Sequence, residues 1–142
     1  MRVGAFSSAL ILGLGLAGMA LAAVPAGDPA AGKKAFDQTC MICHNADKGG
    51  PNGVGPALYG VYGDKAANVP GFSFSEKLKA SKIVWTPDKL DAWLQGPMNL
   101  VPGTKMSIAP ITSASQRADL IAFLKSRSDA PAAAPAKGKK KG

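Results

Sequence analysis

One stretch of five residues constrains this chain more than any other. Residues 40–44 read Cys-Met-Ile-Cys-His and contain both cysteines and the only histidine among the 142 residues. A Cys-x-x-Cys pair in an oxidising compartment can form a local disulfide or act as a redox dithiol. With the adjacent His44 it can also supply three ligands to zinc, or attach a haem. The rest of the sequence has to distinguish among these chemistries.

Attachment of haem c fits the stretch best. Cys-x-x-Cys followed directly by His is the attachment signature of this cofactor. Its spacing lets thioether bonds from Cys40 and Cys43 hold the porphyrin edge while the next residue, His44, reaches the iron. Structural zinc sites usually take four Cys or His ligands, and the chain has three such residues. A dithiol oxidoreductase normally has a βαβ scaffold, and no segment here alternates like a strand.

Helix signals begin just before the motif. Asp28 followed by Pro29 is a good N-cap and first helical residue, and the helix that they start runs directly into Cys40. One narrow apolar face is expected at three- and four-residue spacing, on Gly32, Ala35, Phe36 and Thr39.

Two short helices are predicted in the middle of the chain. The first lies within residues 72–82 and is capped by Ser73 or Ser75. The second begins at Thr86, a cap residue followed by proline, and ends at Gly96 before another proline. Its apolar face is expected at Leu90, Trp93 and Leu94.

A last helix and two long loops complete the expected fold. Ser113 and Gln116 have capping-box spacing and open a helix through about Arg127, with apolar residues at Leu120, Ile121, Phe123 and Leu124. Residues 45–72 and 96–110 are rich in Gly and Pro. Loops beyond ~12 residues are unusual in a compact domain, so the longer one is expected to wrap something other than protein. The predicted fold class is all-α, with few helices and long irregular loops.

The two ends of the chain differ from its body. Residues 1–23 have a small basic start, an apolar centre and the sequence Ala-Leu-Ala-Ala before Val24, which indicates a cleaved signal peptide. The alternative is a retained membrane anchor, and either way the folded part leaves the cytoplasm. Residues 24–127 are then the folded domain. Residues 128–142 are rich in Ala, Pro and Lys and are expected to form a disordered tail.

The charge of the chain argues against one class of partner. The net charge is +8, but four of the basic residues lie in the tail, namely Lys137, Lys139, Lys140 and Lys141. The body is therefore only mildly basic and has no basic stripe with interleaved aromatic residues, so nucleic acid is not an expected partner. The tail either remains solvated or makes a transient contact with an acidic membrane surface or an acidic partner.

An iron that only carries electrons needs a second axial ligand, and no other histidine exists. Methionine is the remaining strong ligand. Met1 and Met19 lie in the signal segment, and Met41 is locked between the cysteines. Met98 and Met106 remain, and the spacing alone does not decide between them.

The order of several motifs resembles that of class I cytochromes c, close to the mitochondrial type. The resemblance covers about residues 28–126 without obvious insertion, and its landmarks are Gly32, Phe36, CMICH, GPALYG at 55–60, VPGFSFS at 69–75, Trp85, PGTKM at 102–106 and DLIAFLK at 119–125. It implies the cytochrome c fold, with three to five helices and long loops wrapped around one covalently bound haem.

The resemblance also implies roles for individual residues. Cys40 and Cys43 would bind the haem covalently, with His44 and Met106 as the axial ligands. Three further residues are expected to contact the cofactor or orient its ligands. The Pro56 carbonyl would hold the His44 ring N–H, Trp85 would donate to a haem propionate, and Thr104 would help orient the Met106 loop. Where the first and last helices cross, the expected contacts are those of Gly32 and Phe36 with Leu120 and Phe123.

The chain departs from this family at several positions. Phe74 and Trp93 stand where tyrosines are expected, the first beside a propionate and the second near the methionine sulfur. Ile108 stands where a phenylalanine usually covers the haem edge. Positions that carry docking lysines in the family are here Met98, Asn99, Thr112 and Ser113, although Lys33, Lys34 and Lys105 remain. A weaker dependence of electron transfer on salt is therefore expected.

The predicted function is one-electron transfer in the periplasm by a monomer with a single haem c. The partners implied are a quinol–cytochrome c reductase or a periplasmic dehydrogenase as donor, and a terminal oxidase as acceptor. The alternative is a haem enzyme such as a peroxidase, or a gas sensor. Both of these need a vacant or easily displaced sixth position on the iron.

Overall fold

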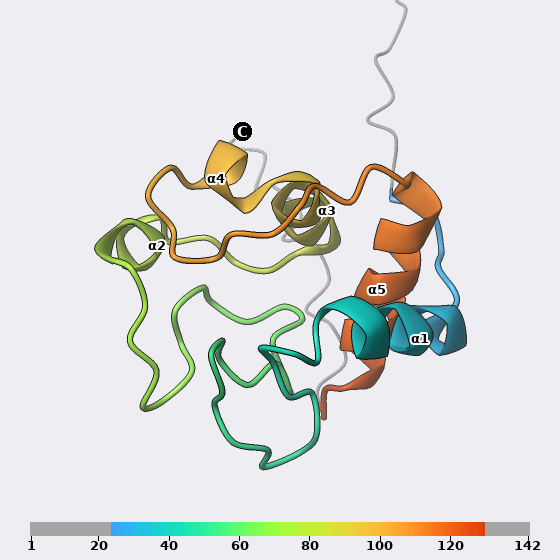
Figure 1. The fold of residues 1–142 in the computed structure, drawn as a ribbon, viewed down its shortest axis with the longest axis horizontal. Helices are drawn as coiled ribbons and strands as arrows, with labels where there is room; N and C mark the ends of the chain where they lie inside the picture. The colour runs from blue at the N-terminus through green and yellow to red at the C-terminus, as the bar shows by residue number, and fades with distance from the viewer. Residues whose placement is uncertain (1–23, 130–142) are drawn as a thin grey trace, which may run out of the picture.

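A computed structural model describes residues 24–129 of the chain (Figure 1). The predicted signal peptide and residues 130–142 of the predicted tail lie outside the described part. The helices are α1 (Pro29–Thr39), α2 (Glu76–Ala80), α3 (Pro87–Gln95), α4 (Pro97–Leu100) and α5 (Ala114–Ser126). Within residues 24–129 the only β-type pairing is an isolated bridge between Lys65 and Val84. The all-α prediction is confirmed.

Side-chain caps begin four of these helices where the sequence predicted them. Asp28 accepts from the Ala30 amide at 2.8 Å and thereby caps α1. The cap of α2 is Ser75 rather than Ser73. Thr86 and Ser113 cap α3 and α5 in the same way. Each cap satisfies a backbone N–H that has no partner inside its helix.

Two local predictions are wrong. Gly96 does end α3, but the chain does not continue as a loop, because the single helical turn of α4 begins at Pro97. Proline suits the first position of a helix, since its missing N–H would have no helical acceptor there. Thr39 was expected on the buried face of α1, yet it is exposed, whereas Gly32, Ala35 and Phe36 are buried.

The helices α1 and α5 cross and make the most extensive helix–helix contact (Figure 1). At the crossing, the rings of Phe36 and Phe123 lie 5.1 Å apart, centroid to centroid. A Cβ atom on Gly32 would lie 1.9 Å from the backbone oxygen of Asp119 and 2.8 Å from the Cβ of Phe123. The expected pairing of the first and last helices is therefore present, and only glycine permits this close approach.

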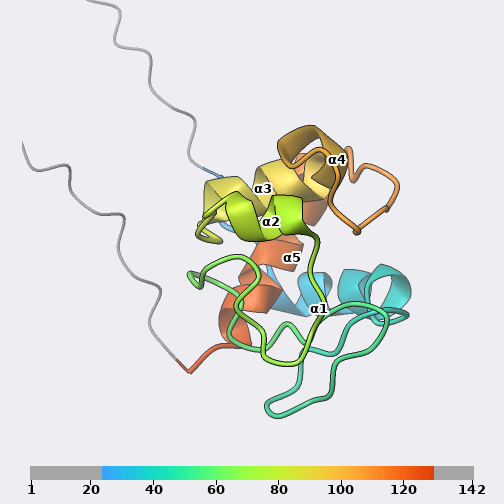
Figure 2. The same cartoon turned by 90° about the vertical axis from the view of Figure 1, so that its left-hand side faces the viewer.

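The long connection between α1 and α2 lies on the opposite side of the molecule from α2, α3 and α4, as Figures 1 and 2 show in teal and green. Backbone bonds tie it to the segment that leads into α3. The Gly63 amide donates to the Trp85 carbonyl at 2.9 Å, and the Trp85 amide donates to the Asp64 carbonyl at 2.8 Å. None of the helices within residues 24–129 is long and apolar enough to cross a bilayer.

Candidate cofactor site

A cavity of about 320 Å³ separates the loop side of the molecule from α2 and α3. Both cysteines, His44 and Met106 line it, together with residues from α1, α2, α3 and α5. The remaining lining is largely aliphatic and aromatic, and it includes Leu78, Leu90, Leu94, Leu120 and Leu124. A mostly apolar cavity with a few polar groups in fixed positions is typical of a cofactor site.

The imidazole of His44 is held in one orientation. Its Nδ1 lies 2.7 Å from the carbonyl oxygen of Pro56. A carbonyl can only accept, so Nδ1 carries the proton and Nε2 of the neutral ring keeps a free lone pair. Burial lowers the pKa of His44, against a smaller opposing effect of the Pro56 bond, and this favours the neutral ring. The contact expected of Pro56 is present.

Gly55 fixes the same ring by contact. A Cβ atom at this position would lie 2.3 Å from Cε1 of His44 and 2.7 Å from its Nε2. The amide of Gly55 donates to the Cys43 carbonyl at 2.8 Å, which brings this loop against the end of the motif. The absence of a side chain at Gly55 therefore lets the backbone press against the ring.

Cys40 and Cys43 lie where α1 ends. The Cys43 and His44 amides both donate to the Cys40 carbonyl, at 3.0 and 2.9 Å, so the motif continues the helix as a tight turn. Burial, with a smaller effect of Cys43, raises the pKa of the Cys40 thiol to about 11. The reactive form of a redox dithiol is the thiolate, which this shift disfavours at neutral pH. Burial therefore works against an activated thiolate at Cys40.

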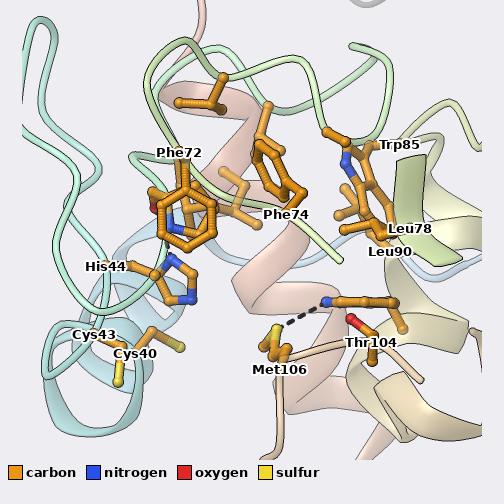
Figure 3. A pocket seen from close by; sticks show the side chains of 18 of the residues that line it. Cys40, Cys43, His44, Phe72, Phe74, Leu78, Trp85, Leu90, Thr104 and Met106 are labelled. Carbon is orange, nitrogen blue, oxygen red and sulfur yellow. Dashed lines mark hydrogen bonds between the residues drawn. The ribbon is translucent and has the colours of Figure 1, made fainter. Parts of the chain in front are cut away.

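Met106 enters the cavity from the loop between α4 and α5. Figure 3 shows its sulfur and the His44 ring pointing into the same space from different segments. The indole N–H of Trp93 in α3 donates to the Met106 sulfur at 3.1 Å. Thr104 is buried and lines the cavity two residues before Met106. The adjacent Lys105 donates to the Ser73 carbonyl at 2.7 Å, which ties this loop to the segment before α2.

Trp85 forms part of the cavity wall beside Trp93. It is buried, and the two indoles pack edge to face with their centroids 5.0 Å apart. Phe72 and Phe74 make a second aromatic pair on the wall, with centroids 4.8 Å apart (Figure 3). Phenylalanine has no hydroxyl to donate, so Phe74 contributes only apolar surface to the cavity.

Met98, the other methionine considered as a ligand, does not line the cavity. It lies on α4 and is 49% exposed, so it belongs to the surface. Asn99, Thr112 and Ser113, which replace expected lysines, are exposed as well. Ile108 is half-buried and does line the cavity. The structure therefore brings Met106, and not Met98, together with the Cys-x-x-Cys-His motif.

Sequence reasoning missed the buried Arg117 of α5. Its side chain is 9% exposed and pairs with Asp91 of α3, with 2.7 Å between Nε and Oδ1. The spacing does indicate that Arg117 is buried, because it precedes Leu120 and Ile121 by three and four residues and so lies on the buried face of the helix. It was overlooked because an arginine is rarely buried unless it is paired, and the partner is distant in sequence.

The donor set fits a haem better than a metal ion alone. Within residues 24–129, no group of three or more His, Cys, Asp or Glu side chains is arranged to hold a metal ion. An unprotonated imidazole nitrogen and a thioether instead line one apolar cavity, with two thiols beside the imidazole (Figure 3). His and Met are an established pair of axial ligands for haem iron.

Comparison with known proteins gives concordant results. The model of the Cytochrome c family matches residues 29–128. Cytochrome c of Euglena viridis is 44% identical over 72% of this chain and 100% of its own length. Cytochrome c2 of Rhodopila globiformis is 46% identical over 70% of this chain and 93% of its own. The structure of cytochrome cH from Methylobacterium extorquens superposes with a TM-score of 0.65 at 46% identity, covering 70% of this chain and 99% of that one.

Proposed function

Since the chain belongs to the cytochrome c family, we propose that its cavity holds a haem c with His44 and Met106 as axial ligands. Members of this family carry one covalently bound haem c and are electron carriers rather than enzymes. When bound, the haem iron supplies one-electron redox chemistry. Cys40 and Cys43 form the two thioether bonds. Met98 lies at the surface and is not a ligand in this proposal.

One observation carries this proposal. The Nε2 lone pair of His44 and the sulfur of Met106 face one apolar cavity, although 62 positions of sequence separate the two residues. The Pro56 carbonyl and Gly55 fix the ring, and Trp93 fixes the sulfur. Both donors are thus oriented by protein contacts. Such supporting contacts normally hold metal ligands in place.

The other predicted cofactor contacts are part of the proposal. Trp85 and Thr104 are buried and line the cavity. In the proposal, Trp85 would donate its indole N–H to a propionate and Thr104 would help orient the loop of Met106. Phe74 has no side-chain hydrogen-bond donor, so Trp85 would supply a larger share of the hydrogen bonding to the haem propionates. The aliphatic lining, with Leu78, Leu90 and Leu94, keeps water from the ring and favours the less charged ferrous state.

Partners and location extend the proposal further. We place the protein in the periplasm as a monomer, with residues 1–23 as a cleaved signal peptide, residues 24–127 as the cytochrome c domain and residues 128–142 as a disordered tail. Electrons would come from a quinol–cytochrome c reductase or a periplasmic dehydrogenase and pass to a terminal oxidase. The tail would make at most a transient contact with an acidic membrane surface.

Binding of carbon monoxide tests the ligand assignment. We expect the reduced holoprotein to bind carbon monoxide slowly or not at all at neutral pH, because two strong ligands leave no open position. Met106→Ala should bind it rapidly. Met98→Ala is the matched control and should behave as the unmodified protein. Rapid binding by the unmodified protein would favour the alternative function, a haem enzyme or gas sensor with a displaceable sixth ligand.

A further inference from the structure

The buried Arg117 lies where α3, α5 and the Met106 loop meet. Its Nε donates to Oδ1 of Asp91, and its Nη1 donates to the carbonyl oxygens of Ile111 at 2.8 Å and Thr112 at 3.0 Å. The side chains of Arg117 and Asp91 are only 9% and 19% exposed. A buried charge pair of this kind is costly unless its hydrogen bonds are made, and here one guanidinium serves three acceptors.

These contacts fix the far end of the loop that carries Met106. The Ile111 amide also donates to the Leu94 carbonyl of α3 at 3.0 Å, so the loop is tied to α3 by its own backbone as well. The loop has no helix or strand between α4 and α5, and its path therefore depends on bonds of this type. The same helix α3 carries Trp93, which bonds the Met106 sulfur.

We propose that Arg117 is a positioning residue, which keeps Met106 on the iron by holding the carbonyls five and six residues further along the chain. This inference rests on the proposed function, in which Met106 is the axial ligand. Lysine at this position keeps the charge but lacks the planar fork that reaches Asp91 and two carbonyls together. Loss of those bonds frees the loop, and the iron then spends more time without its sulfur ligand.

The stability of the Met106–iron bond is measured by competition, in which added imidazole displaces the methionine from the ferric iron. The absorption band of ferric haem that is ligated by a methionine sulfur is a second readout. We expect Arg117→Lys to bind imidazole about tenfold more tightly, equivalent to about 1.4 kcal/mol, and to lose part of the band. Arg127→Lys is the matched control. Arg127 ends the same helix and donates to the Ala46 carbonyl and to Asp47, on the loop after the haem motif. It should change imidazole affinity by less than about twofold.

The free energy of unfolding, measured for both variants by denaturant titration, separates positioning from general support. The inference is overturned if Arg117→Lys leaves imidazole affinity unchanged, or if Arg127→Lys raises it equally at a similar loss of stability. Should Arg117→Lys not fold, Asp91→Asn removes the charge partner and should raise affinity in the same direction. If the unmodified protein lacks the absorption band of methionine-ligated ferric haem, the proposed function itself is refuted.

Discussion

The indole N–H of Trp93 donates to the sulfur of Met106 across 3.1 Å, joining the last turn of α3 to the loop that closes the cavity. A thioether sulfur has two lone pairs, so this bond leaves one pair free for the iron. The bond draws electron density from the sulfur and makes it a weaker donor. Weaker donation disfavours the ferric state, and the indole should therefore raise the reduction potential.

Replacement of Trp93 by phenylalanine should lower the reduction potential by about 20–60 mV. A hydrogen bond contributes ~0.5–1.5 kcal/mol, and a one-electron couple shifts by 59 mV for about 1.4 kcal/mol. Trp93→Tyr keeps a donor and should recover part of the loss. Spectroelectrochemical titration of the three proteins measures the shift, and an unchanged potential in Trp93→Phe would show that the bond does not tune the iron.

Gly55→Ala should displace the His44 ring. The added Cβ would overlap Cε1 and Nε2, the side of the ring that we assign to the iron. We expect less correctly ligated holoprotein and an altered electronic spectrum, measured per mole of covalently bound haem. Val54→Ala changes an exposed neighbour on the same loop and should resemble the unmodified protein. A normal spectrum in Gly55→Ala would mean that the loop can move away without disturbing the ligand.

Gly32→Ala should destabilise the crossing of α1 and α5 although alanine is the better helix former. The added Cβ meets the backbone of Asp119, which cannot rotate away. Overpacking of this kind costs ~1–3 kcal/mol, more than the helix-propensity gain of about 1 kcal/mol. Guanidinium titration followed by far-ultraviolet circular dichroism gives the free energy of unfolding. Lys34→Ala, on the exposed side of the same helix, should change it by less than about 0.5 kcal/mol.

Electron transfer to a partner should depend only weakly on ionic strength. Expected docking lysines are replaced by exposed Met98, Asn99, Thr112 and Ser113, so long-range steering is reduced. We expect the second-order rate to change by less than about threefold between ~10 and ~200 mM salt. Met98→Lys should steepen the dependence on an acidic partner, whereas Met98→Gln, neutral at the same site, should not. A steep fall for the unmodified protein would contradict the prediction.

Local chemistry explains how much of the fold the sequence could predict. Asp28, Ser75, Thr86 and Ser113 cap their helices with bonds to amides two or three residues away, and such short-range bonds are visible in sequence. The turn of α4 was not predicted, because Gly-Pro signals the end of a helix as readily as the start of another.

The site was predictable to different degrees in its two halves. The Cys-x-x-Cys-His half is contiguous, so its geometry follows from spacing. Met106 could be chosen over Met98 only through the family resemblance. The distance in space from each methionine to His44 depends on the path of the loops between them, which the sequence does not give. The pairing of Arg117 with Asp91 spans 26 positions and could not be read from either helix alone.

The shape of the cavity bears on how the protein is made. Its walls include segments far apart in the sequence, among them α1 with the Cys-x-x-Cys-His turn on one side and α3 with the Met106 loop on the other. Apolar side chains on those walls gain little by facing each other across a space that, in the proposed holoprotein, the haem would fill. On the proposed assignment, the haem would be attached to Cys40 and Cys43 before the Met106 loop packs against it.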